Sequence, residues 1–188
     1  MRHRFPPKLL MPLVQLLQSN GTYARMKTGW REQCEAAGEV FQDYAQGTFI
    51  VLDQLAANPE RRAGIFGVQR GDDLPEIICQ ANCTPLPGHP EPVLRIRMVT
   101  ISPELDFGTA PDDPAGRYVR NLVDLFFGIV ELSQESMDAD MQAKDIKFHL
   151  RSPQDYAFFQ AVRSELARIA QFERVEMKGA WLYITRAD

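Results

Sequence analysis

Residues 93–101 read VLRIRMVTI, and this segment constrains the fold more than any other part of the chain. Its residues alternate with a period of two, which predicts a strand with one wetter face. The two alternating sets are Leu94, Ile96, Met98 and Thr100 against Arg95, Arg97, Val99 and Ile101. Two further strands are predicted before it, at residues 63–69 and 76–84. Because turn residues and a proline-rich loop connect these strands, we expect an antiparallel meander.

The rest of the chain is predicted to be mainly helical, with three shorter strands near its end. Apolar residues at helical spacing predict helices over residues 8–18, 30–57, 116–133 and 153–170. The second of these could break near Gly47, where Phe49–Leu52 could instead form a strand. Ser152 is the predicted N-cap of the last helix. The shorter strands are expected at residues 146–150, 172–177 and 180–185, the last two joined by a turn at Lys178–Gly179.

The size and composition of the chain fit one globular domain, or a domain with a helical appendage. The chain has 188 residues, of which 45% are hydrophobic and 24% are charged. That is enough apolar material to bury a core, and it argues against disorder. We interpret residues 1–60 as an N-terminal helical segment and residues 61–188 as an α+β domain. The domain is expected to have a mixed, mainly antiparallel sheet with flanking helices.

The charge balance and the cysteine content limit the classes of partner and the compartment. There are 21 basic and 25 acidic residues, a net charge of −4, so we expect no nucleic-acid partner. Three cysteines do not form a disulfide framework, which favours the cytoplasm. Cys79 and Cys83 lie about 13 Å apart along a strand, too far to bind one metal ion. The apolar run at residues 9–17 is too short for a membrane span.

A possible anion-binding loop follows the central strand, which ends at Ile101. Residues 102–110 read SPELDFGTA, and the later element order is strand, helix, strand, helix and two strands. Over residues 60–188 this resembles the Gcn5-related N-acetyltransferase (GNAT) family, in which a similar loop and the next helix hold the pyrophosphate of acetyl-CoA. Pro103, Glu104, Gly108 and Ala110 match the family pattern, whereas Leu105 stands where Gln or Arg is expected.

The resemblance implies an acyl-CoA site in one of two registers. The first uses the backbone around Ile101, Gly108 and Ala110. The second uses Gly116, Arg117 and Arg120 at the start of the predicted helix, where arginines could pair with phosphate. Between the two registers lies PDDP at residues 111–114, whose two carboxylates work against anion binding.

The catalytic groups that the resemblance implies are only partly present. In many members of the family, a tyrosine on the later helix protonates the departing thiolate, but here that position holds Phe159 or Ala161. Tyr156 is the candidate substitute. Three residues are candidates for the base that deprotonates the amine substrate: Glu76, Glu104 and His149.

Two functions therefore stay open from the sequence. The first is a divergent acyl-CoA-dependent N-acyltransferase that acts on an amine. The second is a catalytically inactive GNAT-like module that binds a protein partner or a second copy of the chain. Its surface would be the N-terminal helix together with Trp30, or the aromatic face of Trp181 and Tyr183.

Overall fold

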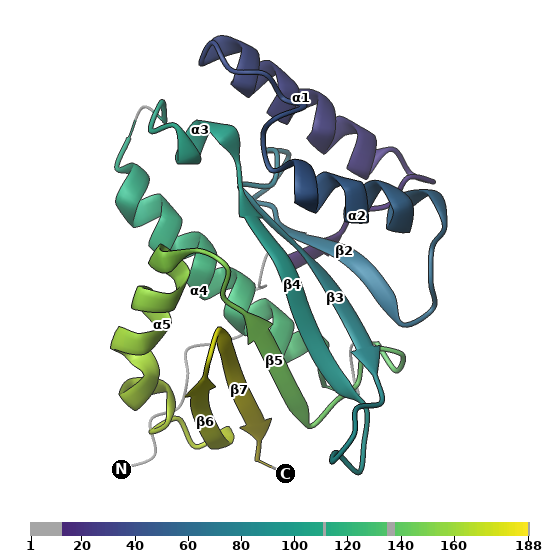
Figure 1. The fold of residues 1–188 in the computed structure, drawn as a ribbon, viewed down its shortest axis with the longest axis vertical. Helices are drawn as coiled ribbons and strands as arrows, with labels where there is room; N and C mark the ends of the chain where they lie inside the picture. The colour runs from purple at the N-terminus through teal and green to yellow at the C-terminus, as the bar shows by residue number, and fades with distance from the viewer. Residues whose placement is uncertain (1–12, 111, 135–137, 188) are drawn as a thin grey trace.

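The computed structural model describes residues 13–110, 112–134 and 138–187. Within these residues seven strands form one sheet in the order β1-β2-β3-β4-β5-β7-β6, and five helices accompany it (Figure 1). The strands are β1 (Leu13–Gln15), β2 (Ala63–Val68), β3 (Ile77–Thr84), β4 (Val93–Ile101), β5 (Asp145–His149), β6 (Phe172–Lys178) and β7 (Trp181–Arg186). The helices are α1 (Thr22–Ala36), α2 (Gln46–Ala57), α3 (Pro103–Asp106), α4 (Pro114–Leu132) and α5 (Pro153–Leu166).

The sheet is mixed and mainly antiparallel, which confirms the predicted α+β class. Neighbouring strands run antiparallel except β4 and β5, which are parallel. The predicted meander is confirmed as β2, β3 and β4, which pair in sequence order. A parallel pair needs a long crossover between its strands, and here α4 supplies it.

Strand β4 carries a β-bulge that changes which of its residues face the core. Thr100 pairs with Ile78 and Arg97 with Gln80, so two residues of β4 lie opposite one residue of β3. Met98 lies at this point with a φ of 52°, a left-handed conformation that is rare outside glycine. Because of the extra residue, Val99 packs against the main hydrophobic cluster, contrary to the predicted alternation.

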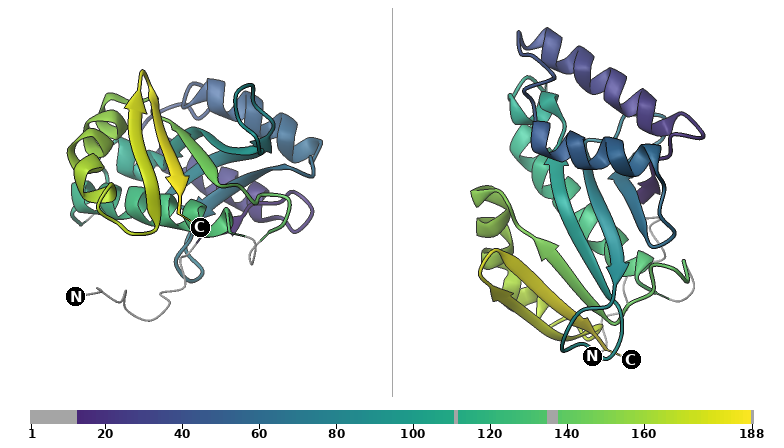
Figure 2. Two further views of the ribbon diagram at one scale, coloured as in Figure 1. Left: turned by 90° about the horizontal axis from the view of Figure 1, so that it is seen from below. Right: turned by 45° about the vertical axis from the view of Figure 1, so that its right-hand side comes forward.

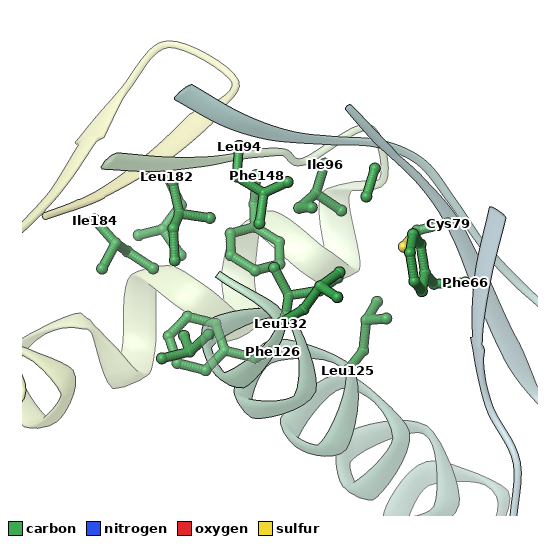
Figure 3. Close-up of a cluster of buried hydrophobic side chains, with 14 of the residues drawn as sticks. Phe66, Cys79, Leu94, Ile96, Leu125, Phe126, Leu132, Phe148, Leu182 and Ile184 are labelled. Carbon is green, nitrogen blue, oxygen red and sulfur yellow. The ribbon is translucent and has the colours of Figure 1, made fainter. Parts of the chain in front are cut away.

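The two faces of the sheet pack against different helices. On one face, α4 and α5 cover a large cluster in which Phe126 stacks on Phe148 of β5 and contacts Phe159 of α5 (Figure 3). On the other face, α1 and α2 cover β2 and the start of β3 around the buried Trp30. Figure 2 shows this second layer beside the sheet. The near face of β4, β5 and β7 in Figure 1 carries no helix of the described chain.

The N-terminal segment is built differently from the prediction. Residues 13–15 form a strand rather than part of a helix, and residues 8–12 lie outside the described residues. Val14 of β1 pairs with Gly67 of β2, so this segment extends the sheet at its edge. The cause is tertiary: Leu13 packs against the main hydrophobic cluster, and this burial outweighs a short helical pattern. The division of the chain near residue 60 stays a prediction.

Several predicted boundaries are also wrong. The single helix over residues 30–57 is two helices, because α1 ends at Ala36 and Gly38 then takes a φ of 76°. The break therefore precedes Gly47, which is helical. The loop after β4 contains the short helix α3, and α5 ends at Leu166 rather than near residue 170. The turn of the last hairpin is Gly179–Ala180, one residue later than predicted.

Candidate functional site

An opening in the described part of the fold lies where β4 and β5 stop pairing. Their paired residues run from Val93 and Asp145 to Ile96 and Phe148, and β4 then continues past its bulge while β5 ends. A cavity of about 610 Å³ opens at this end. Its walls are the last residues of β4, helix α3, the first turns of α4 and α5, and the connection between α1 and α2. We call it the β4–β5 cavity.

Tyr44 attaches the α1–α2 connection to the end of β4. Its hydroxyl donates a hydrogen bond to the carbonyl oxygen of Ile101 at 2.6 Å, and its ring lies edge-on to Phe107. Burial, together with the nearby charge of Asp106, raises the pKa of Tyr44. The phenol is therefore neutral at physiological pH. Ile101, a predicted cofactor-binding residue, does line the β4–β5 cavity, but its carbonyl already accepts this hydrogen bond.

A second phenol in the cavity wall bridges α4 and α5. The hydroxyl of Tyr118 donates a hydrogen bond to Asp155, whose side chain is buried. Burial and this carboxylate raise the pKa of Tyr118, so it stays protonated. The backbone N–H of Asp155 donates to the Ser152 hydroxyl at 2.9 Å, which confirms Ser152 as the predicted N-cap of α5.

The lining of the β4–β5 cavity is acidic. Among the described residues it includes the carboxylates of Glu39, Asp43, Asp106 and Asp155, and it includes no lysine or arginine. The carboxylate of Asp155 accepts a hydrogen bond from Tyr118 of the wall. Such a lining attracts a cation and repels phosphate groups.

Three of the residues predicted to bind or activate ligands lie elsewhere, in a network that joins Glu76, Glu104 and Arg117. Glu76 forms an ion pair with Arg117 and accepts a hydrogen bond from Asn121 Nδ2 at 2.6 Å. Arg70 lies 3.6 Å from the same carboxylate, and Glu104 lies 3.8 Å from Arg117. A second cavity of about 540 Å³ borders this network.

The charges of this network neutralise one another, which leaves no free base. Burial acts to raise the pKa of Glu76, but the hydrogen bonds from Arg117 and Asn121 outweigh it and hold the pKa below its usual value. The pKa of Arg117 is raised, chiefly by its hydrogen bond to Glu76. Glu76 is therefore an ionised structural partner of α4, and Arg117 already has a carboxylate where phosphate was expected.

The predicted phosphate loop is also occupied by internal contacts. The backbone N–H of Gly108 donates to Leu105, and that of Ala110 donates to Glu104 at 3.1 Å. At the start of α4, the N–H of Gly116 donates to Oδ1 of Asp113 at 3.1 Å. Arg120 lies 3.6 Å from the other oxygen of Asp113. A carboxylate thus caps the helix end at which an anionic ligand would bind.

The remaining predicted residues lie apart from both cavities. His149 stacks on Trp181 with ring centroids 4.5 Å apart, on the sheet face opposite α4. Burial lowers the pKa of His149, and the charges of Arg151 and Arg97 lower it further, so the imidazole is neutral at pH 7. Tyr156 points outward from α5, with 41% of its surface exposed.

Trp30 and the cysteines are buried in the fold. Trp30, expected at a partner surface, is fully buried, and its Nε1 donates to the carbonyl of Pro75 at 2.9 Å, so that expectation is wrong. Burial raises the pKa of Cys79 to about 12.

Among the described residues, no group of three or more His, Cys, Asp or Glu side chains could hold a metal ion. No helix in the described part of the chain is long and apolar enough to cross a bilayer.

Comparison with known proteins adds no further assignment. No family model matches the chain, and no curated protein matches its sequence. The site is therefore interpreted from its own geometry.

Two residues that shape the β4–β5 cavity, Tyr118 and Asp155, were not predicted from the sequence. Tyr118 and Asp155 are 37 residues apart, and nothing in the sequence pairs them. The only available signals were an acidic residue in the first turn of a predicted helix and a tyrosine near the start of the central helix. Both have ordinary structural interpretations, so the pairing required the fold.

Proposed function

We propose that the protein is a divergent acyl-CoA-dependent N-acyltransferase with a GNAT-like fold, acting on an amine. One observation carries the proposal. The parallel pair β4–β5 stops pairing at the bulge of Met98, and an acidic cavity of about 610 Å³ lies at the opening. The element order, with three antiparallel strands followed by helix, strand, helix and hairpin, also supports this fold.

The acidic lining supports an amine as the acceptor. Glu39, Asp43 and Asp106 come from the α1–α2 connection and from α3, on the side of the cavity nearest the end of β4. These carboxylates would bind the ammonium form and accept its proton before attack. A neutral amine would then be available next to Ile101.

The structure around the end of β4 fits acyl-CoA, the acyl donor, only in part. Bound acyl-CoA would supply an acyl group activated as a thioester. The backbone N–H of Ser102 donates to the backbone carbonyl oxygen of Glu76, just before β3, at 2.8 Å. Because the hydrogen-bonding direction alternates along a strand, the N–H of Ile101 faces the side where β5 has ended. That edge suits the neutral amide arm of the donor. The capped start of α4 does not suit its phosphates, because Asp113 already occupies the helix end.

The cavity also offers a hydroxyl group that the sequence did not reveal. Tyr118 lines the cavity as a protonated phenol, whereas Tyr156 does not line it. We assign Tyr118, rather than Tyr156, as the group that donates a hydrogen bond to a leaving thiolate. Its single O–H is donated to Asp155 in this structure, so the hydroxyl hydrogen must turn from Asp155 to the sulfur during the reaction.

A second candidate function is favoured by one observation. The capping of α4 by Asp113 and the pairing of Arg117 with Glu76 leave little positive charge for the phosphates of CoA. This favours the alternative, a catalytically inactive GNAT-like module that binds a protein partner or a second copy of the chain. The two functions predict different results with acetyl-CoA.

Calorimetric and thermal-shift titrations with acetyl-CoA test the proposal. A ligand that binds only the folded state raises the melting temperature, so binding predicts a shift that grows with concentration. Release of the free thiol is then measured with a panel of amines. Asp106→Asn should raise the KM for a cationic amine at least fivefold and leave acetyl-CoA binding unchanged. Glu60→Gln, on an exposed turn, is the charge-matched control.

A negative result with acetyl-CoA would decide against the acyltransferase. No melting shift and no heat of binding at millimolar acetyl-CoA would reject the acyltransferase. A dimeric mass in solution under those conditions would then support the second candidate.

A further inference from the structure

The uncovered half of the sheet carries a concentrated set of cations. Leu94 and Ile96 of β4 face the main hydrophobic cluster, so Arg95 and Arg97 between and beside them project from the opposite face. The same alternation on β5 and β7 places the side chains of Lys147, His149, Trp181 and Tyr183 on that opposite face. No helix of the described chain covers it in Figure 1. Arg151 follows His149 by two residues, and its charge lies near enough to lower the pKa of His149. We call Arg95, Arg97, Lys147, Arg151, His149, Trp181 and Tyr183 the basic sheet face.

The cations of this face have no acidic partners. Among the described residues, no carboxylate oxygen lies within 4.0 Å of the side-chain nitrogens of Arg95, Arg97, Lys147 or Arg151. Elsewhere the chain pairs its cations closely. Lys27 lies 2.7 Å from Asp53, and Arg61 lies 2.9 Å from Asp140. This chain has more acidic than basic residues, so it has enough carboxylates to pair these four cations as well. Their unpaired state therefore suggests that they bind a partner.

Aromatic rings are interleaved with these cations. The guanidinium carbons of Arg95 and Arg97 each lie 5.8 Å from the ring centroid of Trp181. The ammonium of Lys147 lies 4.7 Å from the ring of Tyr183. His149 stacks on the ring of Trp181. Cation–π contacts restrict the side chains without neutralising them, so their N–H donors stay available to an anion.

The shape of the face favours a polymer over a small molecule. None of the residues of the basic sheet face lines either cavity described above, whereas small ligands bind in concave sites. Side chains two apart on one strand are about 6.8 Å apart, and neighbouring strands are about 4.8 Å apart. The cations are thus spread over a surface, as a chain of repeated negative charges requires.

We propose that the basic sheet face binds single-stranded nucleic acid. The four cations bind phosphates, and the rings of Trp181 and Tyr183 contact the bases. Rings and cations on an open sheet are the two elements that such recognition combines, and an acidic peptide would have no use for the rings. The net charge of −4 does not exclude a local basic face. Asp145 and Glu176 lie on the same side of the sheet, but each already pairs with another cation. The proposal is independent of the acyltransferase activity.

Fluorescence anisotropy with a labelled oligonucleotide of about 20 nucleotides tests the proposal, with single-stranded DNA and RNA of mixed sequence. At about 50 mM salt we expect micromolar affinity that weakens steeply towards 200 mM. Each phosphate neutralised on a single strand contributes about −0.7 to the slope of log K against log salt. Arg97→Ala and Lys147→Ala should each weaken binding at least fivefold and make the slope shallower by about 0.7.

A ring variant separates base contacts from charge. Tyr183→Leu should weaken binding at least fivefold and leave the salt slope unchanged, because base stacking is not ionic. Arg163→Ala removes the same charge from the exposed surface of α5 and should change neither quantity. Circular dichroism and melting temperature confirm that each variant is folded.

Three results would overturn the proposal. The first is no binding at about 50 mM salt with protein near 100 μM. The second is equal loss of affinity in Arg163→Ala and Arg97→Ala. The third is equal binding of polyglutamate or of a duplex of the same length, which would assign the face to acidic proteins or to duplex phosphates.

Discussion

The Tyr118 hydroxyl of α4 donates a hydrogen bond to Asp155 of α5 in the wall of the β4–β5 cavity. Tyr118→Phe removes this donor and should lower the free energy of unfolding by about 1–2 kcal/mol, measured by urea denaturation. If the acyltransferase proposal is right, kcat falls at least tenfold while the affinity for acetyl-CoA is unchanged. Tyr23→Phe is the matched control, because Tyr23 makes the same kind of bond to Asp53 at 2.8 Å, away from this cavity.

In that control we expect a similar loss of stability and full activity. Equal kcat in Tyr118→Phe and the wild type would remove Tyr118 from the proposed reaction.

Asp113→Asn tests whether the charge at the start of α4 limits acetyl-CoA binding. Asparagine caps helices as well as aspartate, so the hydrogen bond from Gly116 and the stability should be kept within about 0.5 kcal/mol. One negative charge less at a helix N-terminus favours an anion by about 0.3–1 kcal/mol. We therefore expect about threefold tighter binding of acetyl-CoA by calorimetry. An unchanged affinity would mean that the phosphates do not approach α4.

Glu76→Gln should make the pH dependence of stability shallower. The folded pKa of Glu76 lies below its ordinary value of 4.5, so its contribution is fully present above pH 4.5. The contribution is lost as the pH falls through the lowered folded pKa. At pH 7 the variant should unfold with about 2 kcal/mol less free energy, since charged hydrogen bonds to Arg117 and Asn121 are lost. Urea denaturation across this range should show the gap closing in acid.

For this prediction Glu60→Gln serves as the exposed control and should follow the wild type at every pH. A gap that stays constant into acid would contradict the ionised state of Glu76.

Gly128→Ala tests the packing of β1 on α4. A Cβ atom at Gly128 would lie 2.9 Å from Cβ of Leu13, so the strand would have to move. Although alanine favours a helix by about 1 kcal/mol, we expect a net loss of about 1–3 kcal/mol. Gly47→Ala in α2 meets no atom within 4 Å and should stabilise the protein by about 0.5 kcal/mol. A Gly128→Ala protein more stable than the wild type would show that β1 is not held there.

The sequence predicted the strands that alternate and the helices with clear apolar stripes, and it failed where tertiary contacts decide. In β4, Leu94 and Ile96 occupy even positions in the core, whereas Val99 and Ile101 occupy odd ones. This change of phase at Met98 is visible in the sequence and could have indicated a bulge. Residues 13–15 could not have been predicted as a strand, because their hydrogen-bonding partner lies about 50 residues later.

The candidate site was predicted less well, because its residues meet only through the topology. Glu76 and Arg117 were both identified, but as a base and a phosphate ligand, and they neutralise each other across 41 residues. An isolated sequence position carries no information on which charges pair. Asp106 and Tyr44 were not identified as site residues, because Asp106 occupies an unspecified position of the predicted loop and Tyr44 lies in an ordinary apolar stripe.

The wall of the β4–β5 cavity that holds Tyr44 is a connection between two helices, not a strand. Connections tolerate insertion and replacement far better than hydrogen-bonded sheet, because few backbone partners depend on their length. Homologues could therefore exchange this segment to accommodate molecules of other sizes while β4 and β5 stay the same. Changes in residues 37–45 would therefore alter the size and charge of the cavity without altering the sheet.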